Sequence, residues 1–127
     1  MSLEDLIYNE ELEFEKLVPK VKRIVKIKKD GEPVIVCDTR KLSQNEQIVC
    51  YLIGKFFAKQ LGLSKSDSAS NREISETLGI KEKVVAARLK DLRDDGIVEQ
   101  IVRGEHKIST VKLEEFLDRV LEKIEKR

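Results

Sequence analysis

Residues 71–100, NREISETLGIKEKVVAARLKDLRDDGIVEQ, contain the pattern that decides the fold. The stretch predicts two short helices joined by a tight turn. The first helix opens at a capping box, Ser70–Glu73, in which the serine hydroxyl and the glutamate each satisfy a free backbone N–H. The turn is expected at Gly79, which adopts positive φ at little cost, and Ile80 after it is apolar enough to enter the core.

The second helix of this pair is expected over residues 82–95. Val85, Leu89 and Leu92 recur at spacings of four and three, so they share one face of the helix and predict where it packs. Gly96 follows as a left-handed cap that ends the helix.

Two strands are expected next, over 97–103 and 106–110, around a very short turn. With these strands in place, REISETLGI (72–80) and KVVAARLKDLRDDGIVEQ (83–100), followed by HKI (106–108), resemble the winged-helix family. The residues that carry the resemblance are the structural ones, and they indicate a fold more strongly than a single function.

The resemblance extends over residues 41–108, which are similar to winged-helix proteins of archaea, many of them transcription regulators. It implies a three-helix core whose third helix enters the DNA major groove by its N-terminal half, while the wing lies along the backbone. It implies DNA contacts, through outward positions of the helices and through the wing, from Arg72, Lys81, Lys83, Ala86, Ala87, Lys90, Arg103, His106 and Lys107.

The second helix also argues against DNA binding. Base readout favours Arg, Lys, Asn or Gln at its centre, but Ala86 and Ala87 offer only close approach and contact with a thymine methyl. Glu82 lies where a phosphate or a base edge is expected. Two functions therefore stay open: a duplex DNA-binding transcription regulator, or a protein–protein interaction module or scaffold subunit without direct DNA binding.

The N-terminal flank has three expected features. Residues 2–17 suggest an acidic helix, and residues 21–38 suggest a β-hairpin turning at Asp30-Gly31. Ser43–Glu46 is another capping box, and it opens a helix that should run to about Gln60. That helix is apolar on nearly all sides, so it should be buried on nearly all sides. Residues 64–70 are expected to form a polar, mobile linker.

The C-terminal segment, 111–127, predicts an amphipathic helix. It can pack on its own domain, or pair with a second copy and place two recognition helices about one DNA turn apart. A homodimer is the expected state. Its predicted contact residues share one apolar face of the helix: Leu113, Phe116, Leu117, Val120, Leu121 and Ile124.

The chain divides by composition into an N-terminal extension (1–40), a winged-helix domain (41–110) and a C-terminal packing or dimerisation helix (111–127). The expected fold class is α+β and mainly helical. The net charge of +1 over 127 residues does not by itself indicate nucleic-acid binding. Charge is uneven, however: residues 1–16 sum to −5 and residues 17–69 to +6, whereas residues 70–110 are neutral.

Several functions are disfavoured by what the sequence contains. Cys37 and Cys50 lack zinc-site spacing and His106 is the only histidine, so no metal site is expected, and the thiols should be buried and inert. No Gly-rich phosphate loop follows a strand and no nucleophile has a plausible base, so neither catalysis nor a cofactor is expected. The sequence shows neither a signal peptide nor a membrane-spanning run, and the expected location is the cytoplasm.

Overall fold

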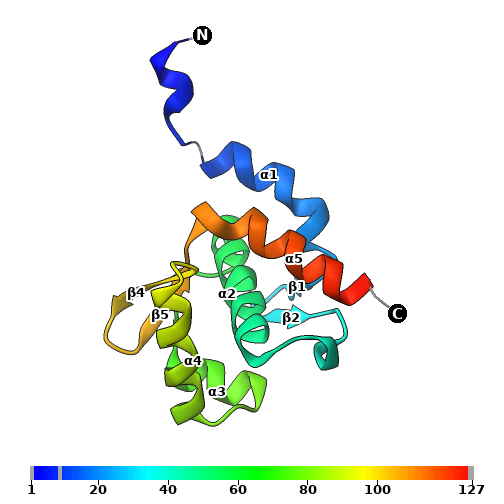
Figure 1. The fold of residues 1–127 in the computed structure, drawn as a ribbon, viewed down its shortest axis with the longest axis vertical. Coiled ribbons are helices and arrows are strands. Elements are labelled where there is room, and N and C mark those ends of the chain that lie inside the picture. The colour runs from blue at the N-terminus through cyan, green and yellow to red at the C-terminus, as the bar shows by residue number, and fades with distance from the viewer. Residues whose placement is uncertain (1, 9, 126–127) are drawn as a thin grey trace.

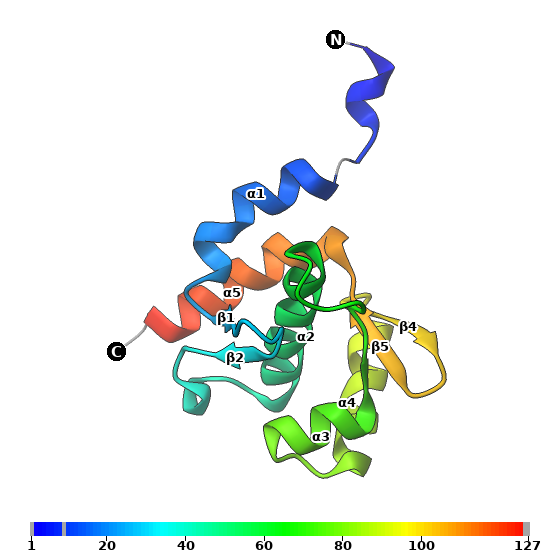
Figure 2. The ribbon, with the colours of Figure 1, turned by 180° about the vertical axis from the view of Figure 1, so that it is seen from behind.

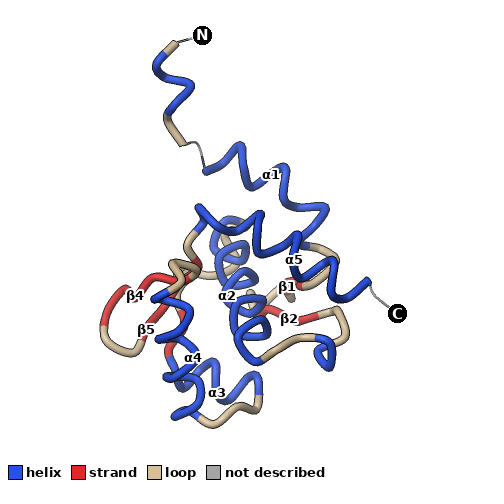
Figure 3. The backbone as a smooth tube through the Cα atoms, in the orientation of Figure 1, coloured by secondary structure: helices blue, strands red, loops and turns tan. Residues whose placement is uncertain are grey.

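The computed structural model describes residues 2–8 and 10–125. The helices, in chain order, are η1 (Leu3–Leu6, 3₁₀), α1 (Glu10–Val21), η2 (Thr39–Lys41, 3₁₀), α2 (Gln44–Gln60), α3 (Asn71–Leu78), α4 (Glu82–Asp94), η3 (Thr110–Lys112, 3₁₀) and α5 (Leu113–Glu125). The strands are β1 (Val25–Ile27), β2 (Pro33–Ile35), β3 (Ala69–Ser70), β4 (Val98–Val102) and β5 (Glu105–Ile108). The fold is mainly helical α+β, as predicted (Figures 1 and 3).

Helix α2 begins at the predicted capping box. The hydroxyl of Ser43 accepts a hydrogen bond from the backbone N–H of Glu46 at 3.1 Å, and the Glu46 carboxylate accepts from the Ser43 N–H at 2.8 Å. The helix ends at Gln60, where the sequence placed its end. Gly62 beyond it takes positive φ. Two satisfied N–H groups at its start and a glycine turn at its end thus define the central helix of the fold.

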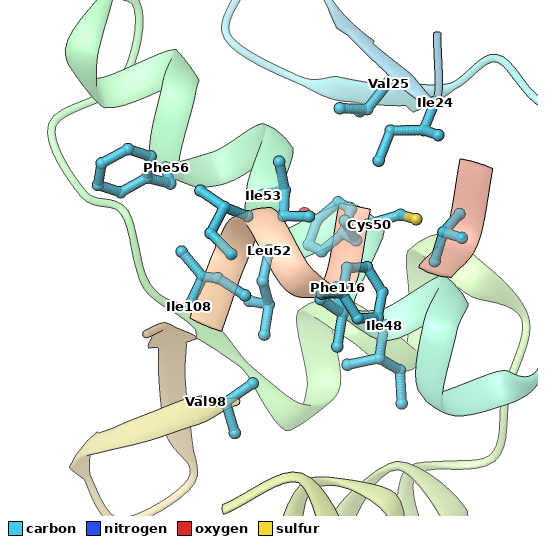
Figure 4. Packing of buried hydrophobic residues seen from close by; sticks show 14 of the residues in the cluster. Ile24, Val25, Ile48, Cys50, Leu52, Ile53, Phe56, Val98, Ile108 and Phe116 are labelled. Atoms are coloured by element: carbon cyan, nitrogen blue, oxygen red, sulfur yellow. The ribbon is translucent and has the colours of Figure 1, made fainter. Parts of the chain in front are cut away.

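The core runs through α2 from one side of the molecule to the other. Figure 4 shows Ile24 and Val25 of the hairpin region at one edge of the core and Val98 and Ile108 of the wing at the other, with α2 side chains such as Leu52 between them. All five of these residues are at most 3% exposed. The prediction that α2 is buried on nearly all sides is confirmed, and its two faces connect the N-terminal and C-terminal parts of the chain.

The predicted hairpin is present, and it packs directly on α2. Strands β1 and β2 are antiparallel, with Val25 opposite Ile35, and Gly31 in the turn has φ of +92°. The hairpin approaches α2 at Gly54, where an added Cβ would lie 2.5 Å from the Cβ of Pro33. A glycine is therefore required at this point of α2, because any larger residue would push the hairpin away.

The N-terminal prediction was only partly correct. A single helix over residues 2–17 was expected, but the structure has the short η1 and then α1, which continues past Pro19 to Val21. Packing accounts for the longer α1: Phe14 contacts the ring of Phe56 edge-on, with ring centroids 4.4 Å apart, and Leu17 is 3% exposed.

The segment predicted to be a mobile linker contains a strand. Strand β3 pairs with β5 in a three-stranded sheet of order β3-β5-β4, with Ala69 opposite His106. Serine hydroxyls organise the residues before it: Ser66 and Ser68 are 2.9 Å apart through their Oγ atoms. The polar composition concealed β3, because a strand of two residues is too short to show alternation.

The second capping box is half formed. The hydroxyl of Ser70 accepts from the Glu73 N–H at 3.0 Å, as predicted. The Glu73 carboxylate instead accepts a hydrogen bond from the Tyr51 hydroxyl at 2.5 Å and pairs with Lys55 at 3.2 Å. Tyr51 is 1% exposed, and a buried hydroxyl needs an acceptor. Glu73 thus links α3 to α2 rather than completing its own cap.

Helix α5 packs against its own chain. Five of its predicted dimer-contact residues are buried in a single copy and the sixth, Ile124, is half-buried. Helix α1 lies alongside it (Figures 1 and 2), and Lys20 pairs with Asp118 at 2.7 Å. The apolar face of α5 is therefore covered without a second copy. Whether the chain forms a dimer stays a prediction.

Both thiols are unpaired in the structure. Cys50 is fully buried, and burial raises its thiol pKa, so it is inert as expected. Cys37 is only half-buried. Across residues 2–8 and 10–125, no helix is both long enough and apolar enough to cross a bilayer. Nor does any group of three or more His, Cys, Asp or Glu in the same ranges gather as metal ligands would.

Candidate nucleic-acid interface

The inward residues of α4 determine which of its residues face solvent. Val85 and Leu89 are fully buried and Leu92 is 2% exposed, as the spacing predicted. Because a helix turns about 100° per residue, Ala86 and Ala87 are carried to the exposed side. The turn before α4 is also as predicted, with Gly79 at φ +70° and Ile80 buried.

The exposed face of α4 carries unpaired lysines. Lys81, Lys83 and Lys90 are exposed and form no ion pair with any residue in the described ranges. The two alanines lie between Lys83 and Lys90 along this face. Because the alanine side chains are small, a large partner could approach the helix backbone there, between Lys83 and Lys90.

The start of α4 adds positive potential. Lys81 is the N-cap, and its side chain makes no capping hydrogen bond. The free N–H groups of a first helical turn and the helix dipole favour an anion there. Glu82 opposes this effect, because it is an exposed acid in the same turn. Lys81 and Lys83 flank it, and these two charges outnumber the carboxylate.

Apart from Glu82, the acids of α4 lie at or near its other end. Asp94 and Asp95 are exposed at the C-terminus, more than ten residues from Lys81, or roughly 20 Å along the axis. Asp91 pairs with Arg88 at 3.6 Å. A phosphate bound near the N-terminal half would therefore meet cations, with these carboxylates at a distance beyond the Debye length at physiological salt.

The remaining predicted DNA-contacting cations differ in their exposure and in whether they form ion pairs. Arg103 is exposed in the wing turn, next to Gly104, and forms no ion pair with residues 2–8 or 10–125. Lys107 is half-buried, with its Nζ 4.0 Å from a carboxylate oxygen of Glu99. Arg72 is exposed and pairs with Glu76 at 3.1 Å, one helical turn away. Exposed pairs of this kind are weak enough to exchange for a phosphate.

His106 was predicted on the wing surface, and this is wrong. It is 2% exposed, because β5 alternates and directs His106 and Ile108 into the core. Its Nε2 lies 2.6 Å from Nη1 of Arg93. Arginine only donates, so Nε2 must be the unprotonated nitrogen. Burial, and then the charge of Arg93, lower the pKa of His106, and the neutral ring holds β5 against the end of α4.

Two features of this surface were missed from the sequence. Arg88 is half-exposed on α4, and its Nε donates to the side chain of Gln44 at the start of α2 at 3.3 Å. Its spacing of four from the half-buried Val84 places it at the edge of the exposed face. On the wing, Ile101 and Val102 are 48% and 59% exposed. A break in the strand register between Gln100 and Val102 disturbs the alternation that would have buried one of them.

The wing lies beside α4 in both views (Figures 1 and 2), and strand β4 of the wing is in contact with α4. A comparison with protein families matches residues 63–99 to a winged helix-turn-helix DNA-binding family. The match covers β3, α3, α4 and the start of β4. No curated protein and no solved structure matched the chain. With β5 completing the wing, the fold is that of a winged helix-turn-helix, and residues 63–99 are similar to a DNA-binding family of that fold.

Proposed function

We propose that the protein binds duplex DNA through α4 and the wing, and that it acts in transcription regulation. The observation that carries the proposal is the set of exposed cations without ion pairs among the described residues, Lys81, Lys83, Lys90 and Arg103, on the segment that matches or adjoins a DNA-binding family. Charged side chains that already have partners would have to give them up to bind phosphate, whereas these four do not.

The roles of these residues follow from their positions. Lys81 and Lys83 bind phosphates or base edges where α4 enters the major groove, and Lys90 binds farther along the same helix. Arg103 binds the flanking backbone from the wing, with Lys107 and Arg72 at the edges of the footprint. Such contacts position the protein on DNA without reading its sequence.

Sequence preference on this surface should be modest. Ala86 and Ala87, at the centre of the exposed face, have no hydrogen-bonding group, so they admit the groove edge and contact thymine methyl groups. The side chains best suited to bidentate base contacts are absent from these two positions. Most of the binding free energy would then come from phosphate contacts and depend on salt.

A second candidate function has one observation in its favour. Ile101 and Val102 expose apolar side chains on β4, where a wing that lies along DNA backbone has no need of them. Contiguous exposed apolar patches on soluble proteins often mark docking sites for other proteins, and these two residues would contribute to one. A winged helix that docks a protein partner through its wing would explain them, and it would leave the α4 lysines as solvated surface charges.

The deciding experiment is the fluorescence anisotropy of a labelled random-sequence duplex titrated with protein over a range of salt concentrations. Four phosphate contacts predict a slope of log K against log salt near −4, at about −0.9 per phosphate. Binding with such a slope supports the α4 interface, and selection from a random library would then measure sequence preference. An unchanged anisotropy even at low salt would favour the protein-docking function.

A further inference from the structure

The N-terminal arm, residues 2–8, extends away from the body of the protein (Figures 1 and 2), and its large apolar side chains are exposed. Leu3 and Leu6 are 84% and 82% exposed, and Ile7 is 71% exposed. Leu3 and Leu6 lie three residues apart in a 3₁₀-helix, so they align on one side of it. Three large aliphatic side chains in one short segment carry a free-energy cost in water that burial would remove.

A groove of about 390 Å³ lies at the far end of α1, between that helix, β1 and the end of α2. Six of its lining residues are apolar and two are lysines: Val18, Val21, Val25, Ile27, Phe57, Leu61, Lys22 and Lys26. A cavity of about 150 Å³ holds a benzene molecule, so this groove has room for roughly two side chains of leucine size. Its rim residues Val18 and Leu61 are 48% and 65% exposed.

The arm and the groove are complementary in charge as well as in polarity. The arm carries Glu4 and Asp5 beside its leucines, and both are exposed. Lys22 and Lys26 at the groove are exposed and have no ion-pair partner in the ranges that the structure describes. An apolar insertion flanked by two acids therefore matches an apolar groove flanked by two lysines.

The arm does not reach the groove of its own chain in this conformation. The hydroxyl of Tyr8 donates to the Thr110 carbonyl at 3.2 Å, which holds the arm near the start of α1. The groove begins at Val18, about 12 Å farther along α1 from Glu10. The four residues of η1 span only about 8 Å and extend away from the body (Figure 1).

We propose that the arm of one copy docks in the groove of a second copy, and that the exchange is reciprocal. Leu3 and Leu6 enter the groove, while Glu4 and Asp5 approach Lys22 and Lys26 of the other copy. Because each copy contributes one arm and one groove, two contacts close a two-fold dimer and no open chain of copies forms. This dimer uses neither the buried face of α5 nor α4, so it stands or fails independently of DNA binding.

The test is a mixing experiment without DNA, read by light scattering at about 50 µM protein, where micromolar association is populated. The arm variant is Leu3→Ser, Leu6→Ser, and the groove variant is Val18→Glu, Leu61→Glu. All four residues are exposed, so both variants should fold. The wild type should have twice the 14.6 kDa mass of one chain. Each variant alone has lost both contacts, so its mass should fall to that of one chain.

The mixture distinguishes arm exchange from any other dimer. The groove variant keeps an intact arm and the arm variant keeps an intact groove, so an equimolar mixture regains one of the two contacts and forms a heterodimer. Val111→Ser is the matched control, because Val111 is 77% exposed but lies outside both the arm and the groove, and it should keep the wild-type mass. A monomeric wild type, variants that still dimerise, or a mixture that stays monomeric would each overturn the proposal.

Discussion

The end of α1 and the hairpin after it (residues 20–36, called the hairpin region below) and the α4–wing region both expose basic side chains, but their surroundings differ. In the hairpin region Lys20 pairs with Asp118 and Arg23 with Glu125, both on α5, and further lysines border an apolar groove. On α4 the lysines stand beside exposed alanines and a free helix start. The hairpin region belongs to the segment with the higher net charge, yet the proposed DNA interface lies on α4, whose lysines are exposed and form no ion pair with the described residues.

The difference shows why segment charge is a poor guide to an interface. Residues 17–69 sum to +6, but acids from the C-terminal helix lie against them in space. The net charge of residues 70–110 is zero, but several of their carboxylates already bind other side chains. Glu73, for example, accepts a hydrogen bond from Tyr51 and pairs with Lys55. What matters for phosphate binding is which cations remain exposed and unpaired, and on what shape of surface.

The largest expected effect tests α4 against the hairpin. Replacing Lys83 and Lys90 by Glu removes two charge-assisted contacts of about 1.5 kcal/mol each, so DNA binding should weaken about 100-fold or more. Lys28→Glu, Lys29→Glu makes the same charge change at the exposed hairpin turn and should change affinity about twofold at most. Anisotropy at fixed salt measures both, and circular dichroism checks folding. An equal loss in the two variants would place the hairpin in the footprint.

The next effect concerns stability and tests whether the hairpin is a structural element. In Gly54→Ala the new Cβ would lie 2.5 Å from Pro33 and 3.0 Å from Val25. Overpacking of this kind should lower the free energy of unfolding by about 2 kcal/mol, measured by urea denaturation. DNA affinity below the melting range should not change, because α4 is not in contact with the hairpin at Gly54. Unchanged stability would mean that the hairpin shifts freely on α2.

Much of this architecture could be predicted, because periodicity and caps are local. The inward face of α4, the box at Ser43 and the glycine turns at Gly79 and Gly96 were all correct. His106 was misplaced because it was assigned to an exposed wing, whereas the alternation of β5 places it on the face that packs on the core, and β3, which pairs with it, was not revealed by the sequence.

The candidate interface was less predictable than the fold. Exposure of Lys81, Lys83 and Lys90 follows from helical spacing alone, and the structure agrees. The long-range partners of other charged side chains cannot be predicted from helical spacing. The Glu73 carboxylate accepts a hydrogen bond from Tyr51 on α2, and Arg88 donates one to Gln44, which is 44 residues away in the sequence. The packing of α1 on α5 could not be predicted either, because a sequence shows that a helix has an apolar face but not which element covers it.

A smaller effect is expected from His106, whose lowered pKa makes the stability of the fold depend on pH. In the unfolded chain His106 takes up a proton near pH 6.5, while in the fold burial and Arg93 resist protonation. Its contribution to stability is therefore complete above pH 6.5 and is lost as the pH falls below it. Each pKa unit of depression corresponds to about 1.4 kcal/mol. Thermal melts from pH 7.5 to 5 should show the loss in the wild type and not in His106→Gln.

Glu46 also contributes pH-dependent stability, but at a lower pH than His106. Burial alone would raise the pKa of Glu46, but hydrogen bonds from Lys123 and from the Ser43 N–H lower it overall. Stability from Glu46 is thus lost only as the pH falls below about 4.5, outside the histidine range. If His106→Gln kept the wild-type slope between pH 7.5 and 5, the buried ring would not be the group responsible.

The smallest effect returns to the two basic regions. Asp118→Asn, Glu125→Gln releases Lys20 and Arg23 from their carboxylates without altering any basic residue. Because these cations lie beside α5 and not beside α4, the slope of log K against log salt for DNA should stay at its wild-type value. A slope steeper by about 1 to 2 would mean that each freed cation had reached a phosphate. The footprint would then include the hairpin region, and α5 would be acting as an internal competitor of DNA for its basic side chains.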